Sequence, residues 1–183
     1  MTLCTGLFLI GLASTYAPIQ APAPSTQTSP PTLEMLRARA QERMREDLKI
    51  YSPADLRALE ELYQSANRDL RGPQAKDALL RVVKDYPKSN RAGSAVLYLA
   101  QLSSGAEREA YLKTAIDEHG DAWYGDGVQV GAFARAQLAN VYVAAGKMPE
   151  AKALADEIAE RFPGAVDHRG QPLLDMLRNL KLR

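Results

Sequence analysis

The stretch Gly131–Gly164, GAFARAQLANVYVAAGKMPEAKALADEIAERFPG, has the features of two consecutive helices. Gly146 stands at the end of the first helix, where glycine commonly stops a helix. Pro149 falls at the first position of the second helix, where the N–H that proline lacks would have no partner. Pro163 then ends the second helix. The stretch therefore predicts a pair of helices joined by a short turn.

Similar helix signals recur along the chain from residue 32 on, and no run of β-branched residues alternates with period two as in a strand. Ser52, followed by proline, predicts one helix start, and another helix is predicted to begin near Ser89 or Asn90. Ser104 and Glu107 have the spacing of a capping box. Helical patterns cover the ranges 32–51, 52–73, 74–87, 89–105, 104–120, 128–146, 149–163 and 170–182.

The first of these helices is highly charged and has one narrow apolar stripe. Such a stripe can pack on a neighbouring helix of the same chain or on a second chain. Its members, spaced three and four residues apart, are Leu33, Leu36, Ala40, Met44 and Leu48.

Three helix pairs end in a similar way, with DYP at Pro87, EHG at Gly120 and RFP at Pro163. Helix pairs repeated every 30 to 45 residues or so indicate an α-solenoid, because each pair has an apolar face that it buries only by stacking on the next.

The third pair resembles the tetratricopeptide repeat (TPR) family. It has the leucine, small residue and aromatic residue that the family places on the first helix, and the small and apolar residues and final proline of the second. These residues are Leu138, Ala139, Tyr142, Ala151, Ala155, Ile158 and Pro163. The resemblance extends, more loosely, over 52–164. It implies an all-α, short right-handed α-solenoid of about three TPR-like helix hairpins, preceded by a charged helix and closed by a C-terminal capping helix.

The N-terminal part differs in composition from the helical part. Residues 7–13, LFLIGLA, fit the apolar region of a secretory signal, although no Lys or Arg precedes them and Pro18 follows the best cleavage site. We expect 1–17 to be a signal peptide or an N-terminal anchor that contacts the membrane, 18–31 to be a Pro/Ser/Thr-rich linker, and 32–183 to be the repeat domain. This organisation predicts an exported protein, periplasmic or anchored facing the periplasm.

Charge and motifs exclude several classes of function. The formal net charge of +1 provides no field that would attract nucleic acid, and the one cysteine, Cys4, cannot form a disulfide within the chain. We find no nucleophile–base motif, no phosphate-binding loop and no metal-ligand spacing, so we expect no enzyme activity and no cofactor.

The segment DAWYGDG, residues 121–127, joins two helix pairs and has two interpretations. As architecture, Asp126 caps the following helix while Trp123 and Tyr124 cover the apolar edge of the preceding pair. As a binding surface, the same three residues contact a partner from an extended loop on a rigid scaffold. The two interpretations are compatible.

In TPR proteins the first helices line a concave groove that binds peptides. The resemblance places Ala132, Ala136, Asn140 and Val143 on that groove, with Asn140 as a candidate partner for a ligand backbone. Alternatively, Asn140 bonds to a neighbouring helix.

The stretch YPKSNRAGSAVLYLAQL, residues 86–102, also resembles exported bacterial TPR scaffold proteins. This resemblance implies a non-catalytic scaffold that binds a peptide segment or another protein in the bacterial envelope. One alternative is a structural protein that self-associates through the 33–48 helix and the last helix. Another is a small metal-dependent hydrolase built from His119, His168, Asp126 and Asp167, two of which, Asp126 and Asp167, are otherwise expected to cap helices.

Overall fold

The computed structural model describes residues 31–178, and within that range the chain forms eight α-helices and no strand. The expected all-α class is therefore confirmed. The predicted signal peptide or anchor, 1–17, and almost all of the predicted linker lie outside the described residues. The elements are α1 (Leu33–Glu46), a 3-10 turn η1 (Asp47–Lys49), α2 (Pro53–Arg68), α3 (Ala75–Asp85), α4 (Asn90–Leu102), α5 (Gly105–Asp117), α6 (Val130–Ala144), α7 (Met148–Arg161) and α8 (Leu173–Arg178).

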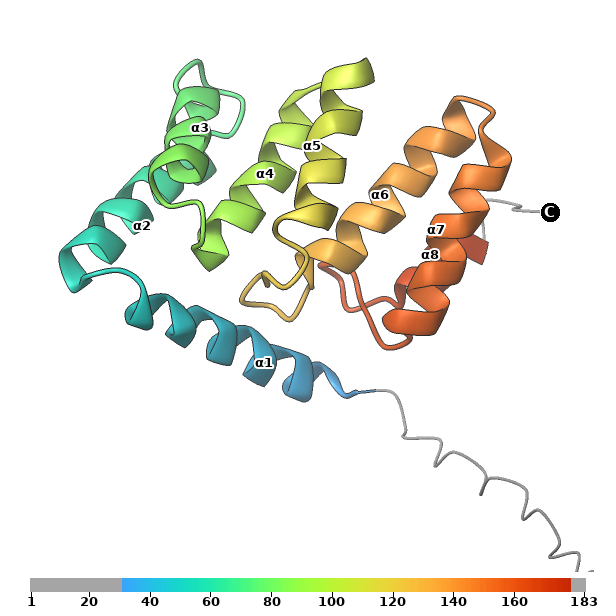
Figure 1. The fold of residues 1–183 in the computed structure, drawn as a ribbon, viewed down its shortest axis with the longest axis horizontal. Helices are drawn as coiled ribbons and strands as arrows, with labels where there is room; N and C mark the ends of the chain where they lie inside the picture. The colour runs from blue at the N-terminus through green and yellow to red at the C-terminus, as the bar shows by residue number, and fades with distance from the viewer. Residues whose placement is uncertain (1–30, 179–183) are drawn as a thin grey trace, which may run out of the picture.

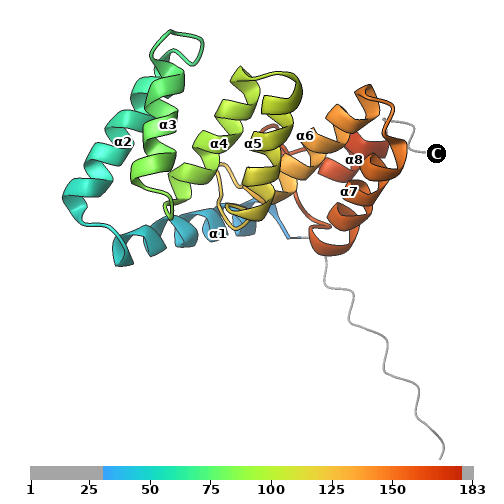
Figure 2. The same ribbon diagram turned by 45° about the horizontal axis from the view of Figure 1, so that its top comes forward.

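Helices α2 to α8 form a row in which each helix packs on the next (Figure 1). The pairs α2–α3, α4–α5 and α6–α7 stand side by side, and α8 packs on both α6 and α7 (Figure 2). Contacts also join α2 to α4, α4 to α6 and α6 to α8, so the first helices of successive pairs are neighbours. This arrangement buries α4 and α6 on most of their sides.

Three apolar clusters follow one another along the row. The first lies between α2, α3 and α4 around Leu79 and Leu99. The second joins α4, α5 and α6 around Leu97 and Leu112. The third joins α6, α7 and α8 around Ile158. Each cluster draws on helices of adjacent pairs, so no pair buries its apolar face alone.

Side-chain caps mark where three of the helices, α1, α2 and α4, begin, and two predicted starts are confirmed. Ser52 and Asp55 form a reciprocal capping box at α2, and the Ser89 hydroxyl accepts from the Ala92 N–H at α4. The predicted capping box at Ser104 is wrong, because its side chain forms no capping bond at α5.

Two predicted aspartate caps are also wrong, because the helices after them begin later. Helix α6 begins at Val130 and α8 at Leu173. Asp126 instead accepts from the Val128 N–H at 3.4 Å, and Asp167 accepts from two backbone N–H groups of its own loop. Both carboxylates therefore stabilise loops and not helix ends.

The loops that contain these aspartates have the same backbone structure. We call residues 119–129 the first connector and residues 162–172 the second connector. In the first connector, the Val130 N–H donates to the Ala122 carbonyl and the Tyr124 N–H donates to the Val128 carbonyl. In the second connector, both bonds recur 43 residues later, from Leu173 to Ala165 and from Asp167 to Gln171. Each connector turns at a glycine with positive φ, Gly127 or Gly170. The connectors are thus two copies of one small hairpin.

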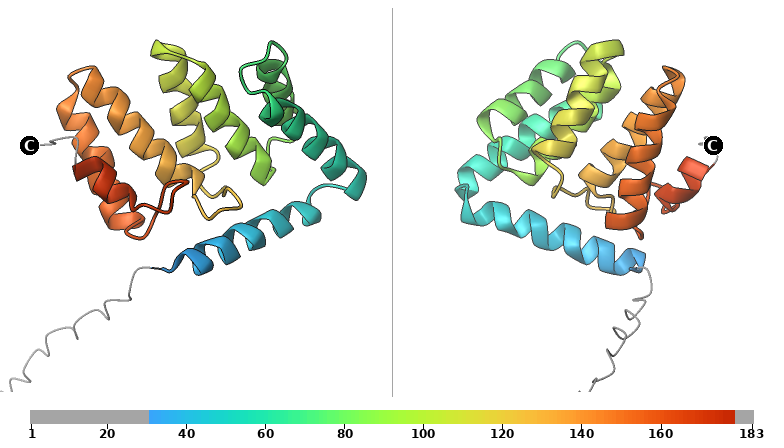
Figure 3. Two further views of the ribbon diagram at one scale, coloured as in Figure 1. Left: turned by 180° about the vertical axis from the view of Figure 1, so that it is seen from behind. Right: turned by 45° about the vertical axis from the view of Figure 1, so that its right-hand side comes forward.

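Helix α1 crosses the end of the row where both connectors lie (Figures 1 and 3). Its buried residues Leu36 and Ala40 form a fourth cluster with Trp123 of the first connector and Val166 of the second. Gly127 approaches the backbone of α1 so closely that a Cβ there would lie 3.1 Å from the Cβ of Leu36. The middle of the predicted stripe on α1 therefore packs within the chain, while Leu33 and Leu48, at its two ends, remain exposed.

Candidate functional site

Trp123, a predicted binding residue, is held between α1 and α4. Its side chain is buried beneath Leu36 and Ala40, with 9% of its surface exposed. Its backbone forms two hydrogen bonds with the amide of Asn90, which donates to the Trp123 carbonyl at 2.7 Å and accepts from its N–H at 2.8 Å. Trp123 therefore anchors the first connector, and little of its surface is exposed to solvent.

Tyr124, the next predicted binding residue, points the opposite way, into the core between the second and third helix pairs. Its hydroxyl donates to the Ser94 carbonyl at 3.3 Å, and its ring lies 6.1 Å from that of Tyr98. Burial raises its pKa well above the usual value for tyrosine. For Tyr124 the structure agrees with the architectural interpretation.

Asp126, the third loop residue, links the two connectors. Its carboxylate lies 2.8 Å from Nδ1 of His168, and both side chains are 40% exposed. The His168 ring also contacts the rings of Tyr124 and Phe133 edge-on, at 4.7 and 5.1 Å between centroids. The contact fastens one connector to the next.

Asn140 donates to the Ala136 carbonyl at 3.0 Å, one turn earlier in its own helix. Ala132 and Ala136 are completely buried in the cluster that includes Leu173 of α8. The expectation that these two alanines line an open groove is therefore wrong, because α8 covers this face of α6.

A polar cluster that the sequence did not reveal fixes α1 to the row. Asp47 is buried at the beginning of α4, where it accepts from the Asn90 N–H at 2.9 and 3.1 Å. Arg43 donates to Asp47 at 2.8 Å and to Asp121 of the first connector at 2.9 Å. A carboxylate at a helix N-terminus also interacts favourably with the helix dipole. Arg43 and Asp47 are four residues apart, but only the folded chain brings them to Asn90 and Asp121, so no local pattern predicted the cluster.

The structure pairs two residues of the predicted hydrolase alternative, Asp126 and His168, but does not gather all four into one site. His119 is buried, and this burial lowers its pKa below the usual value. His168 pairs with Asp126, while Asp167 accepts bonds from its own loop. Within residues 31–178, no three His, Cys, Asp or Glu side chains are grouped so that they could hold a metal ion.

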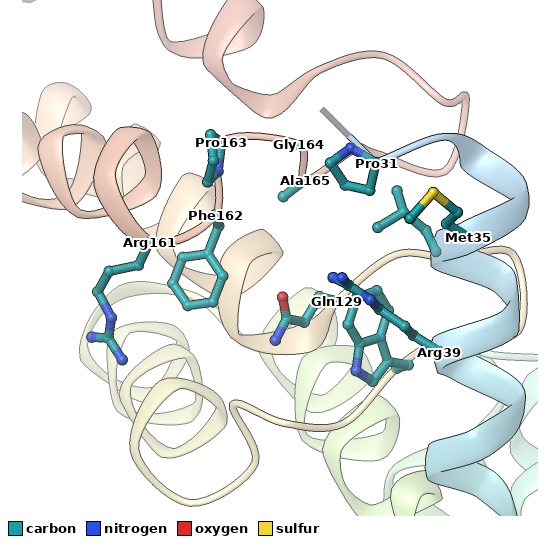
Figure 4. Close-up of a pocket in the computed structure, with 11 residues that line it drawn as sticks. Pro31, Met35, Arg39, Gln129, Arg161, Phe162, Pro163, Gly164 and Ala165 are labelled. Carbon is teal, nitrogen blue, oxygen red and sulfur yellow. The ribbon is translucent and has the colours of Figure 1, made fainter. Parts of the chain in front are cut away.

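A concave site lies between α1 and the two connectors, a cleft of about 340 Å³ (Figure 4). The wall from α1 carries Met35, Leu36 and Arg39, and Trp123 and Gln129 of the first connector lie at its base. The remaining lining residues belong to the chain before α1, the end of α7 and the second connector: Pro31, Arg161, Phe162, Pro163, Gly164 and Ala165.

This cleft combines apolar surface with positive charge. Met35 is 51% exposed although it is a large apolar side chain. Two arginines but no acidic residue line the cleft. Gln129 uses its amide N–H to donate to the Gly120 carbonyl at 3.2 Å, and this bond fixes the side chain in place. Such a surface favours an anionic ligand that also has an apolar part.

Comparisons with protein families, with curated proteins and with solved structures find no match to this chain. Within the described residues, no helix is both long enough and apolar enough to cross a membrane. The function must therefore be argued from the site itself.

Proposed function

We propose that this chain is a short right-handed α-solenoid of the TPR kind that acts as a non-catalytic scaffold and binds another protein. The row of three helix pairs supports this proposal, because the residues that resemble the TPR pattern lie at helix contacts. Leu138 and Ala139 are buried on α6, while Ala151 and Ile158 are buried on α7. On this view α8 is the first helix of a fourth unit, since its connector repeats the one before α6.

The observation that carries the binding function is the cleft between α1 and the connectors. It places two exposed side chains of α1, Met35 and Arg39, beside the buried Trp123. Exposed apolar surface bordered by charged groups is typical of a protein-binding site. Among the described residues, no nucleophilic side chain is paired with a general base as it would be in a catalytic site.

A location at the cell envelope is part of the proposal and is supported by the sequence alone. The apolar run 7–13 and the Pro-rich segment after it are typical of an export signal followed by a tether. A tether of this kind would let the helical domain reach a partner at some distance from its attachment point.

Self-association is the second candidate function. It is favoured by Leu33, Met35, Leu48 and Ile50, which are exposed large apolar side chains on or beside α1. Leu36 and Ala40, however, already pack within the chain, so only the outer part of the predicted stripe is available to a second copy.

The test is crosslinking in cells of a tagged full-length chain, followed by mass spectrometry, for the wild type and for Met35→Glu. Leu80→Glu is the matched control, because Leu80 is also an exposed apolar residue but lies on α3 outside the cleft. We expect one dominant partner that only Met35→Glu loses. Crosslinks to the chain itself alone would favour self-association, and equal capture by all three proteins would contradict a role for the cleft.

A further inference from the structure

We propose that the cleft between α1 and the connectors binds an extended acidic segment of the partner protein, with a carboxylate at Arg39 and a neighbouring apolar side chain on Met35 and Phe162. This inference rests on the proposed function and specifies the chemistry of the partner. It also places binding at the edge of the row where the helix pairs are joined.

Charge complementarity is the first argument. Arg39 forms no hydrogen bond or ion pair with any described residue, whereas Arg43 and Arg45, on the same helix, both pair with carboxylates. Arg161 is 59% exposed and comes no closer than 3.9 Å to its one carboxylate neighbour, Glu157. With no acidic residue in the lining, the cleft has unbalanced positive charge that an anionic partner would neutralise.

The shape of the cleft is the second argument. A volume of about 340 Å³ is at the lower end of the range of about 300–1,000 Å³ for small-molecule sites, and this cleft is open to solvent. Gly164 and Ala165 contribute little side-chain volume to the lining. In the close-up, Met35 and Arg39 extend from α1 on one side, Phe162 lies on the other, and Arg161 points away (Figure 4). A chain that passes across the opening fits this shape better than an enclosed ligand does.

Recognition of an Asp or Glu next to an apolar residue follows from the positions of these side chains. Guanidinium groups bind carboxylates through paired N–H donors. Met35 has a flexible and polarisable side chain that adapts to different apolar partners. Phe162 is half-buried, and Arg135 and Arg161 lie 5.2 and 5.4 Å from the centre of its ring, so its position is fixed. Binding would also cover exposed apolar surface on α1.

The experiment selects peptides from a phage-displayed random library on the purified full-length chain. The variants are Arg39→Glu and Arg37→Glu, because Arg37 is an exposed arginine of the same helix that does not line the cleft. We expect selected peptides to be enriched in Asp and Glu beside apolar residues. We expect Arg39→Glu to weaken their binding by about tenfold, which corresponds to about 1.4 kcal/mol, and Arg37→Glu to leave it nearly unchanged.

Trp123 supplies a direct readout, because it is the one tryptophan of the chain and lines the cleft. Titration with a selected peptide should shift its fluorescence, and the affinity should fall as salt increases. If peptides are selected but bind Arg39→Glu and the wild type equally, this inference is wrong while a protein-binding function stands. If no peptide is enriched and crosslinking captures no partner, both proposals fail.

Discussion

Replacing Asn90 by alanine removes the two hydrogen bonds that hold the first connector against α4. The side chain of Asn90 is fully buried, and its amide bonds to both backbone groups of Trp123, at 2.7 and 2.8 Å. Those two groups point away from the connector hairpin, whose own bonds are made by the residues on either side of Trp123. The substitution therefore leaves a buried N–H and a buried carbonyl without a partner.

The expected loss of stability follows from the number of buried polar groups that lose their partner. A buried polar group without a partner costs about 1–3 kcal/mol, so two such groups predict that the free energy of unfolding falls by about 2–6 kcal/mol. For a domain of this size, each kcal/mol lowers the melting temperature by about 2–4 °C, so the melting temperature should decrease by roughly 4–24 °C. Urea unfolding followed by circular dichroism measures the first quantity, and Trp123 fluorescence reports on the connector.

Asn140→Ala is the matched control, because it is the same chemical change on a neighbouring helix. Asn140 donates one bond to the previous turn of α6 and is only half-buried. Alanine also has the higher helix propensity, so we expect a change within about 0.5 kcal/mol. If Asn90→Ala were as stable as Asn140→Ala, the bonds to Trp123 would not hold the connector, and the reasoning would be refuted.

Three further predictions concern the contacts around α1 and the connectors. Gly131→Ala should destabilise the fold by about 1–3 kcal/mol, because the new Cβ would lie 2.6 Å from the Gly120 carbonyl oxygen, whereas Gly125→Ala, with its nearest neighbour at 3.7 Å, should change the unfolding midpoint little. Asp47→Ala should make α1 more susceptible to trypsin before the helix pairs unfold, because it removes the buried carboxylate that fixes α1 to α4; equal cleavage rates in variant and wild type would contradict this. Burial lowers the pKa of His119, so the unfolded chain binds a proton first as the pH falls, and stability should decrease below about pH 6.5. The urea midpoint of His119→Gln should depend less on pH than that of the wild type, and the same pH dependence in both proteins would disprove the effect.

The helix pairs were largely predictable from the sequence, because their signals are local. Serine caps, prolines at helix starts and apolar spacing all act within one or two turns, and the starts at Ser52 and Ser89 are confirmed. The predicted caps at Asp126 and Asp167 failed because each connector forms a hairpin before the next helix begins. A comparison of the two loops could have revealed the hairpin, since an alanine is followed five residues later by glycine in both, at Ala122 and Ala165.

The candidate site was not predictable, because its residues are brought together only by folding. Arg39 and Phe162 line one cleft but are far apart in the sequence, since Arg39 belongs to α1 and Phe162 follows α7. The sequence did single out Trp123, which lines that cleft, although its side chain is largely buried under α1. An aromatic residue in a glycine-rich loop indicates an important position but does not distinguish an anchor from a contact surface.

The course of α1 has a consequence for the order in which the molecule assembles. Helix pairs in a row contact only their neighbours, so they can fold in sequence with short-range contacts. Helix α1 cannot dock in this way, since Pro31 lies against Gly164 and Leu36 against Gly127, contacts that require both connectors to be in place. We therefore expect α1 to dock last in refolding. Once docked, α1 contacts both connectors, and we therefore expect the row of helices to unfold as one cooperative unit.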